Sequence, residues 1–372
     1  MAAMEENSGN CNSELIAELN QKIARHSNFL TDSNRASRKR GLEGIIKELF
    51  SGALSSSSST VVVVYKSVQV AVTKLIADPV EKCRELAIST VEKYLELTND
   101  YNTVLPAIVP YLVQRLGQQE IIEPSEELRL QLSQLTTKLV CLSEKQNSLY
   151  LDDYIKVLQR TLVDPFYEVR KEACKCASIL AKSIPEHFHL QSESLIKPLL
   201  HSISHQHYKV RVAVINAIGQ VLLYGNNKNV DDVVSHLAQR LFDQSAAVRE
   251  AVTKLAGMWL LQLPDRYSFW HKLMPLLLTS LTDELPSIQE EAACLWHDVG
   301  IRYLRENEND MKEKEDFEAA QPKHYPLVLK DRILGVENWF TGINPRLYRG
   351  CQETYLIGWL RREKSLPLYF TL

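Results

Sequence analysis

The sequence predicts an all-α fold in which helical hairpins stack one on the next, an α-solenoid. Three observations support this: glycine and proline are sparse, at 13 and 14 of 372 residues; apolar residues recur with a helical period; and an aspartate-to-arginine spacing repeats along the chain. Few glycines leave few of the left-handed turns that β-hairpins and phosphate-binding loops require. A repeated supersecondary unit is typical of solenoids, which bury a continuous core only by stacking.

The composition is that of an ordinary globular chain. Its 45% hydrophobic content is too high for a disordered protein. With 43 basic and 46 acidic side chains the formal net charge is -3, so the chain has no general field that attracts nucleic acid or anionic membrane. No apolar run approaches the ~20 residues of a membrane helix. We therefore expect no nucleic-acid partner and no membrane insertion.

Cysteine usage indicates a reducing compartment. The chain has seven cysteines, an odd number, and its N-terminus lacks a signal-peptide core. Most lie in apolar helical stretches, so we expect small buried hydrophobes and not a disulfide framework. They are Cys11, Cys83, Cys141, Cys174, Cys176, Cys294 and Cys351.

The repeating unit is a polar corner in which an acidic residue precedes an arginine by six positions. The arginine column falls at residues 38, 84, 129, 170, 211, 249 and, as glutamine, 289, with steps of 46, 45, 41, 41, 38 and 40. Seven hairpins are predicted. Four corners are complete, one carries glutamine, and two keep the arginine but lose the aspartate: Asp32/Arg38, Asp78/Arg84, Asp164/Arg170 and Asp243/Arg249; Asp283/Gln289; Glu123/Arg129 and His205/Arg211.

Each hairpin is expected to pair an apolar first helix with a second helix that opens at the corner. Prolines within apolar runs at 108–112, 195–200 and 273–277 predict kinks in the first helices. Pro79 and Pro165 directly follow the corner aspartates, so Asp78 and Asp164 are predicted N-caps with proline at the first helical position, and Glu81 completes a capping box with Asp78.

The arginine column lies at the edge of a buried stripe. Counted from each arginine, apolar or small residues fall mainly at −1, +3, +4, +7, +10 and +11, which share one helical face. An unpaired guanidinium there would be costly, so each should find a carboxylate on the corner of an adjacent hairpin. We predict a structural ladder, not catalytic acids and cations, made by Asp32, Arg38, Asp78, Arg84, Arg129, Asp164, Arg170, Arg211, Asp243, Arg249 and Asp283.

Positions +5 and +9 lie opposite the buried stripe and form what we call the second-helix surface. Five of these fourteen positions are lysines and two are acids, which predicts a polar, mildly basic trough along the concave side of the stack. We hypothesise that it binds an acidic or helical segment of a client; the alternative is that exposed lysines only confer solubility. The candidate binding residues are Lys47, Lys93, Lys138, Lys175, Asn216, Gln220 and Lys254.

This pattern of helix, polar corner and second helix resembles HEAT repeats, whose hairpins carry a proline kink in the outer helix and an Asp…Val-Arg corner before the inner one. Residues 164–170 (DPFYEVR) are the cleanest copy, and the resemblance covers residues 13–304. It implies a right-handed, armadillo-like superhelix of about seven hairpins. Four more specific strings resemble the HEAT-repeat family of dynein axonemal assembly factors: 187–196 (HFHLQSESLI), 203–212 (ISHQHYKVRV), 230–236 (VDDVVSH) and 265–269 (DRYSF).

The resemblance implies a cytoplasmic, non-enzymatic factor that helps to preassemble dynein arms for motile cilia. Its expected partners are dynein arm chains and other assembly factors or chaperones, with no small-molecule substrate. A generic HEAT adaptor, such as a nuclear transport receptor or a phosphatase scaffold, is the alternative. Family members continue with further repeats, so the chain is expected to be a C-terminally truncated or alternative form.

No catalytic or cofactor-binding motif stands out. The sequence has no G-x-G-x-x-G, G-x-x-x-x-G-K-[ST], H-E-x-x-H or G-x-S-x-G. Cys174 and Cys176 would point ~200° apart on a helix, so they cannot share a metal. The histidines of 187–207 lack an accompanying carboxylate or cysteine cluster. We expect no enzyme activity, cofactor or metal.

The predicted domain organisation has four parts. Residues 1–12 are expected to be disordered, 13–304 to form the solenoid, 305–326 to be a charged and proline-containing linker, and 327–372 to be a poorly ordered, non-repeat tail.

Overall fold

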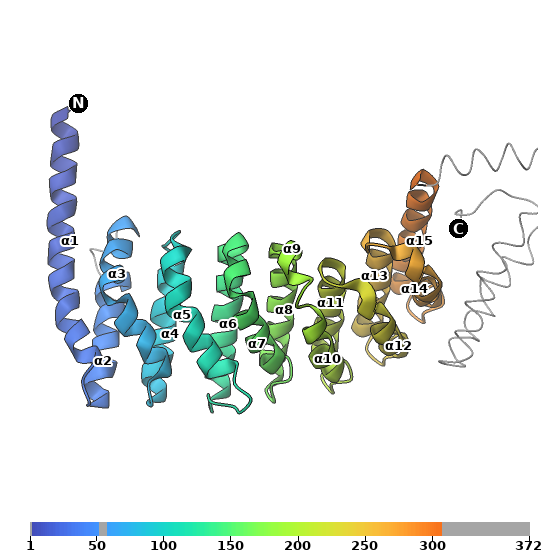
Figure 1. Cartoon of the computed structure of the whole chain (residues 1–372), viewed down its shortest axis with the longest axis horizontal. Coiled ribbons are helices and arrows are strands. Elements are labelled where there is room, and N and C mark those ends of the chain that lie inside the picture. Colours follow the sequence, from blue (N-terminus) through green and yellow to red (C-terminus); the bar gives the residue numbers. More distant parts are fainter. Residues whose placement is uncertain (1, 52–57, 307–372) are drawn as a thin grey trace, which may run out of the picture. The chain divides into compact units, whose positions relative to one another are not determined.

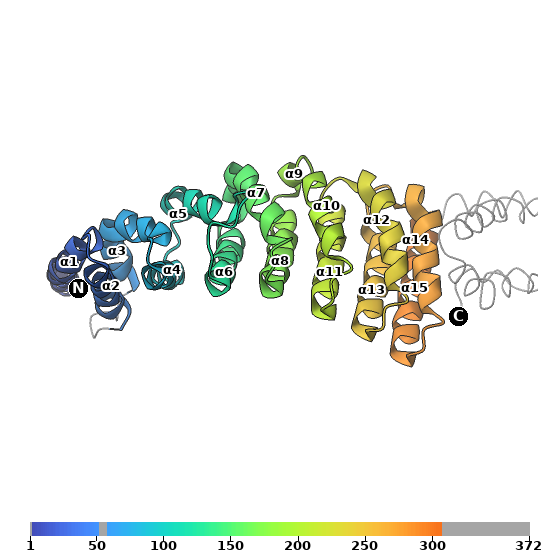
Figure 2. The same ribbon diagram turned by 90° about the horizontal axis from the view of Figure 1, so that it is seen from below.

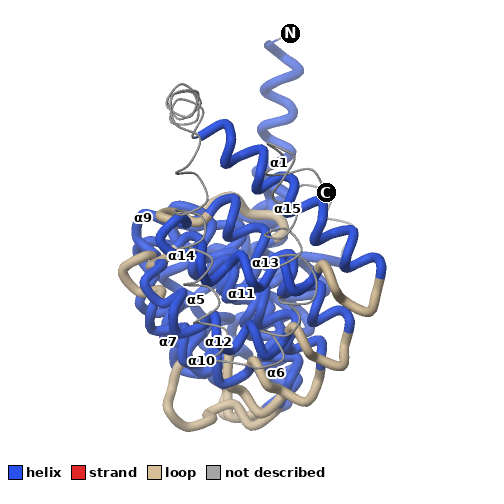
Figure 3. Tube along the Cα trace, turned by 90° about the vertical axis from the view of Figure 1, so that its right-hand side faces the viewer, coloured by secondary structure: helices blue, strands red, loops and turns tan. Residues whose placement is uncertain are grey.

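The computed structural model describes residues 2–51 and 58–306 (Figure 1). In these ranges the chain forms helices joined by short connections and no strand (Figure 3), which confirms the all-α prediction. The chain divides into two compact units, Met1–His187 and Phe188–Leu372. The boundary falls in α9 (Pro185–Phe188), a single helical turn.

The first unit contains four helical hairpins. Figure 2 shows their first helices in one layer and their second helices in the other. The first-helix layer is α1 (Ala2–Leu30), α3 (Ser58–Lys74), α5 (Tyr101–Leu116) and α7 (Leu151–Thr161); the second-helix layer is α2 (Arg35–Ile46), α4 (Glu81–Leu95), α6 (Glu126–Ser143) and α8 (Tyr167–Ser183). Short helical turns link some of them: η1 (Lys47–Ser51), η3 (Leu75–Ala77) and η4 (Glu144–Tyr150).

The second unit contains three further hairpins within its described part. Its first-helix layer is α10 (Glu193–Ser202), α12 (Val230–Arg240) and α14 (Arg266–Ser280); its second-helix layer is α11 (Tyr208–Tyr224), α13 (Ala246–Gln262) and α15 (Pro286–Glu306), with the turn η5 (Asn227–Asn229) before α12. In each unit, helices of one layer pack against their neighbours in that layer and against their hairpin partners.

The predicted buried stripe of the second helices is observed. In α11 the residues at the predicted positions are fully buried, and so are their counterparts in α8. These residues are Val210, Val214, Ile215, Ile218, Val221 and Leu222 in α11, and Val169, Ala173, Cys174, Ala177, Leu180 and Ala181 in α8. Neighbouring hairpins are also joined by a polar contact, in which the indole of buried Trp259 donates to the Gly219 carbonyl, 3.1 Å away. Burial of this apolar face is the main term that holds a solenoid together.

The prolines of the first helices lie inside continuous helices. Pro106 and Pro110 lie in α5, Pro198 in α10 and Pro275 in α14. Each removes one backbone donor from the helix that contains it.

The domain boundaries differ from those expected. Helix α1 begins at Ala2, so residues 2–12, which we expected to be disordered, are helical; no proline interrupts the chain before Leu30. The region 13–304, expected to be one solenoid, falls into two units. Helix α15 ends at Glu306, and the remainder of the expected linker and the tail lie outside the described residues.

Within the described residues, one helix is long and apolar enough to cross a membrane by its length and composition, whereas no such segment was expected from the sequence. The segment Ser59–Ala77 has a mean hydropathy of 1.5 and is 56% buried. Its buried residues include Val61, Val64, Tyr65 and Val68, and α3 packs against α1, α4 and α5. This packing is that of a core helix, which passes the same test, so the span is weak evidence for a membrane.

Gly41 allows α1 and α2 to approach closely. A Cβ atom at this position would lie 2.9 Å from the carbonyl oxygen of His26 and 3.0 Å from carbons of Phe29 and Leu30. Because the nearest atom belongs to the backbone, a side-chain rotation cannot relieve the clash.

We predict that Gly41→Val lowers the free energy of unfolding by about 1–3 kcal/mol, the usual cost of overpacking. Urea unfolding followed by circular dichroism measures this change. Ala36→Val is the matched control, since Ala36 is exposed on the same helix. Equal stability of the two variants would contradict the close approach.

Candidate functional site

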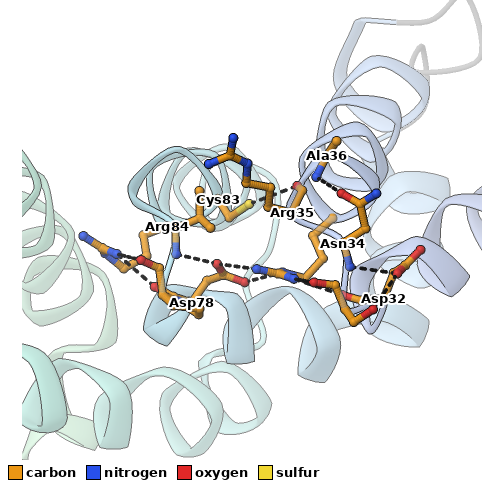
Figure 4. Close-up of polar contacts among 11 residues, drawn as sticks. Asp32, Asn34, Arg35, Ala36, Asp78, Cys83 and Arg84 are labelled. Carbon is orange, nitrogen blue, oxygen red and sulfur yellow. Dashed lines mark hydrogen bonds and ion pairs between the residues drawn. The ribbon is translucent and has the colours of Figure 1, made fainter.

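The most regular polar feature of the first unit is a series of arginine–carboxylate pairs between successive corners. The Nε and Nη2 atoms of Arg38 donate to the two carboxylate oxygens of Asp78, at 2.6 and 3.1 Å. Arg129 binds Asp164 in the same way, at 2.8 and 3.1 Å. Each arginine lies in the first turn of a second helix, and its carboxylate lies at the corner of the next hairpin. Figure 4 shows the corner of Asp32 and the next corner, with Asp78 and Arg84. The fork geometry of guanidinium and carboxylate orients each corner against its neighbour.

The same arginines also bind their own corners. Nη1 of Arg38 donates to the carbonyls of Asp32 and Ser33, at 3.0 and 2.9 Å. Nη1 of Arg129 donates to the carbonyls of Glu123 and Pro124, both at 3.1 Å. One guanidinium therefore satisfies two backbone carbonyls of its own turn and a carboxylate of the next, which uses its five donors efficiently.

Glu123 occupies the ladder position that an aspartate holds at other corners. It was not among the predicted ladder residues. Nε and Nη2 of Arg84 donate to its two oxygens, both at 2.7 Å, and Nη1 donates to the Asp78 carbonyl at 2.9 Å. Arg115, at the end of α5, also donates to Glu123. The Glu123 side chain is fully buried, so its negative charge is compensated by these two arginines. The spacing of Glu123 before Arg129 was the available signal, whereas nothing in the repeat pointed to Arg115.

The second unit repeats the arrangement. Arg211 binds Asp243 through Nε and Nη2, at 2.8 and 2.7 Å, and Arg249 binds Asp283 at 2.7 and 3.0 Å. At the corner that lacks an aspartate, the backbone carbonyl of His205 still accepts from Arg211 Nη1 at 2.7 Å. The corner backbone therefore keeps its role even where the acidic side chain is absent.

Three column residues have other partners. The Asp32 carboxylate accepts from the backbone N–H of Asn34 at 2.9 Å, and this hydrogen bond lowers its pKa. Arg170 donates to the carbonyls of Asp164 and Val163 in its own corner. Gln289 donates through Nε2 to the carbonyl of Asp283 at 2.6 Å, which replaces the arginine's contact with its own turn.

The prediction that the corner aspartates are helix N-caps is wrong. Helix α4 begins at Glu81 and α8 at Tyr167, three residues after Asp78 and Asp164. Each aspartate instead accepts from the backbone N–H two residues ahead, in an Asx turn, at 2.7 Å for Asp78 and 2.8 Å for Asp164. The remaining carboxylate capacity goes to the arginine of the preceding hairpin, so the turn is stabilised and not the helix start.

Three ladder carboxylates, those of Glu123, Asp243 and Asp283, are stabilised in their charged form. Burial alone would raise the pKa of Glu123, but hydrogen bonds from Arg84 and Arg115 outweigh it and hold that pKa below its ordinary value of 4.5. The pKa values of Asp243 and Asp283 lie below 3.8 because hydrogen bonds from Arg211 and Arg249 likewise outweigh burial.

The second-helix surface is less basic than its lysine content predicts. The +5 residues are mostly exposed, but most +9 residues are half-buried. Lys175 and Lys254 pair with acids on their own helices, Glu172 at 3.6 Å and Glu250 at 2.6 Å. Exposed pairs of this kind neutralise charge locally and add little stability.

Lysines of the +9 position join neighbouring helices in the first unit. Lys138 donates to the Glu92 carbonyl at 3.1 Å and to the Glu96 carboxylate at 2.9 Å. The Nζ atom of Lys93 lies 6.0 Å from the centroid of the Phe50 ring, within range of a cation–π contact. Lys47 is exposed.

The second-helix surface changes character in the second unit. Asn216 is exposed, and Gln220 donates through Nε2 to the Met258 sulfur at 3.4 Å. On α11 these uncharged side chains take the positions that lysines hold in the first unit, whereas Lys254 on α13 is again basic. The positive charge of the surface is therefore discontinuous within the second unit.

The cysteines are only partly buried, and no metal site is formed in the described ranges. Cys83, Cys174 and Cys176 are buried, but Cys141 and Cys294 are exposed, contrary to expectation. Burial raises the pKa values of Cys174 and Cys176 to about 12, which keeps both thiols protonated. Across residues 2–51 and 58–306, no three histidine, cysteine or acidic side chains converge as metal ligands would.

Stacked hairpins joined by corner ion pairs define a helical-repeat protein of the HEAT and armadillo type. Residues 29–314 match the family described as "Dynein axonemal assembly factor 5-like, TPR repeats". The chain belongs to this family. The steps of 38 to 46 residues exceed the ~34 residues of a tetratricopeptide repeat and suit HEAT or armadillo units.

Relatives in this family are similar over most of the chain. A dynein axonemal assembly factor 5 from Xenopus laevis is 50% identical over 319 residues, which are 86% of this chain and 38% of the relative. The Homo sapiens protein of that name is 48% identical over 266 residues, which are 70% of this chain and 31% of the relative. The chain thus spans 31–38% of the length of these relatives.

Solved structures support the architecture alone. A designed armadillo repeat protein in complex with the peptide (KR)4 has a TM-score of 0.50 at 17% identity, over 61% of this chain and 97% of that chain. An engineered protein has a TM-score of 0.54 at 15% identity, over 74% of this chain and 68% of that chain.

We predict that Arg84→Met lowers the free energy of unfolding by about 3 kcal/mol, because it leaves a buried carboxylate with part of its compensation. Chemical denaturation measures the loss. Lys82→Met is the control, because its pair with Glu85 is exposed and is expected to contribute less than about 1 kcal/mol. Similar losses in both variants would contradict the structural role of the ladder.

We also predict that acid destabilises the protein through these carboxylates. A group whose folded pKa is lowered contributes stability above its unfolded pKa and loses it as the pH falls through the folded pKa. The urea concentration at the midpoint of unfolding should therefore decrease as the pH is lowered from about 5 to about 2. The Glu123→Gln variant should start less stable and depend less on pH over this range. An equally steep acid dependence in that variant would exclude Glu123 as a contributor.

Proposed function

We propose that this chain is a non-enzymatic scaffold that takes part in the cytoplasmic preassembly of axonemal dynein arms. Membership of the family, over residues 29–314, is the observation that carries this proposal. The relatives' name refers to dynein assembly, and the similar region covers most of this chain but less than half of theirs. We therefore propose that the region shared with this chain takes part in the assembly role to which the relatives' name refers.

A binding role suits the chemistry of the ladder better than a catalytic one. The buried charges at the corners are committed to each other and to backbone carbonyls, as Arg84 and Glu123 illustrate. A catalytic acid or base needs a pKa near the working pH and access to substrate. The pKa of Glu123 is instead lowered and its side chain is enclosed.

We infer that client or chaperone segments bind along the second-helix surface of each unit. Four cations of this surface remain available for pairing with a partner, since their own contacts are exposed or only partly enclosed: Lys47, Lys93, Lys175 and Lys254. Lys138 differs, because it joins α4 to α6 through Glu92 and Glu96. Exposed lysines that pair with a partner's acids would give specificity and a salt-dependent association rate.

Affinity purification from ciliating cells tests both parts of the proposal. The wild-type chain should retain dynein arm chains, and changing Lys47, Lys93, Lys175 and Lys254 together to glutamate should reduce their recovery by about tenfold, since four weak pairs sum to roughly 1.4 kcal/mol. Lys138 is left intact so that the packing of α4 and α6 is unchanged.

The matched control changes four exposed lysines away from this surface to glutamate: Lys74, Lys156, Lys197 and Lys228. It adds the same negative charge and should leave recovery unchanged. Equal recovery with both sets would exclude the second-helix surface as the binding site. Absence of dynein arm chains from the wild-type sample would reject the assembly role itself.

A further inference from the structure

The corner between α12 and α13 departs from the pattern of the other corners. Arg240 stands three residues before the corner carboxylate of Asp243, and Phe242 stands directly before it. The position of Arg240 holds an uncharged or acidic residue at the six other corners: Phe29, Leu75, Glu120, Thr161, Ser202 and Ser280. The ladder therefore does not require a cation at this position.

A cavity of about 270 Å³ opens at this corner, within the second unit. It is lined by Arg211, Gln239, Arg240, Phe242, Asp243 and Gln244. A cavity of this size is slightly smaller than a typical small-molecule site of ~300–1,000 Å³, so it suits a side chain or two of a protein segment.

The cavity holds one cation more than its anion can satisfy. Both oxygens of Asp243 accept from Arg211, and one of them also accepts from the backbone N–H of Ser245 at 2.9 Å. Arg240 reaches Asp243 only through Nη1, at 3.5 Å, and its Nε is buried without a hydrogen-bond partner. A guanidinium with unused donors in a partly enclosed site binds a carboxylate more strongly than a fully solvated one does.

An apolar surface adjoins this cation. The side chain of Phe242 is 43% exposed and lines the same cavity. Aromatic residues and arginine are both enriched at protein interfaces relative to the rest of the surface.

We propose that this corner is a second binding site, which takes an acidic protein segment with one carboxylate on Arg240 and a neighbouring apolar side chain on Phe242. A carboxylate fits better than a phosphate because the lining carries a single surplus positive charge and Asp243 would repel a dianion. The site lies at the hairpin tips, and its existence does not depend on the dynein assembly role.

Fluorescence anisotropy with a labelled octapeptide of alternating glutamate and leucine tests the proposal, in about 50 mM salt, where exposed charges are weakly screened. The wild-type chain should bind this peptide and not its glutamine–leucine counterpart. Arg240→Gln should weaken binding by at least tenfold, and Phe242→Ser should also weaken it. Arg160→Gln, which removes an exposed arginine from the last turn of α7, is the matched control and should bind as the wild type does.

Three results would overturn the proposal: no binding to the wild-type chain, equal binding by Arg240→Gln and Arg160→Gln, or full displacement of the peptide by millimolar inorganic phosphate, which would indicate a general anion site. Arg240→Lys keeps the charge and separates loss of binding from loss of fold. It should retain part of the affinity, with thermal unfolding unchanged, whereas a loss as large as that of Arg240→Gln would count against a charge-based site.

Discussion

The structure depends on the way in which one guanidinium serves two turns at once. Arg84 donates to backbone carbonyls of its own corner and to the Glu123 carboxylate of the next. Both side chains are almost completely buried. A charge in such a place is tolerated only with its partner present, so the corner of the following hairpin must stand in register. The apolar stripes supply most of the stacking energy, but the hydrophobic effect is non-directional, whereas a bidentate ion pair requires one geometry. Register within each unit is therefore set by a few polar contacts at the edge of a large apolar surface.

Much of this arrangement could be predicted from the sequence, because both its signals are periodic. The apolar stripe and the six-residue spacing of corner acid and arginine identified the all-α fold and the arginines that bind Asp78, Asp164, Asp243 and Asp283. Features that depend on one neighbour in space were missed. Arg115 reaches Glu123 from another helix, and Lys175 and Lys254 each pair with an acid of their own helix. The corner aspartates stabilise turns because their oxygens are already shared with an arginine.

The family match and the fold match carry different information. Similarity near 50% over most of the chain defines a family, whereas solved repeat proteins at 15–17% identity share only the stacking of hairpins. This difference is expected, since the buried stripe accepts many apolar residues, as the valines and isoleucines of α11 and the alanines and cysteines of α8 illustrate. The individual character of this chain lies in its exposed positions and in corners that depart from the pattern, of which the one at Arg240 is the clearest.

The constant distance from corner acid to arginine has a consequence for how such a chain can change in length. Successive repeats differ by up to eight residues, from 38 to 46, yet the six-residue interval is the same at all five corners that carry both an acid and an arginine. An insertion within that interval would move the guanidinium away from the carbonyls it binds, while an insertion between the end of one second helix and the next first helix would disturb no corner contact. Evolutionary gain and loss of residues should therefore accumulate at the opposite ends of the hairpins, where longer loops would leave the corner ion pairs intact.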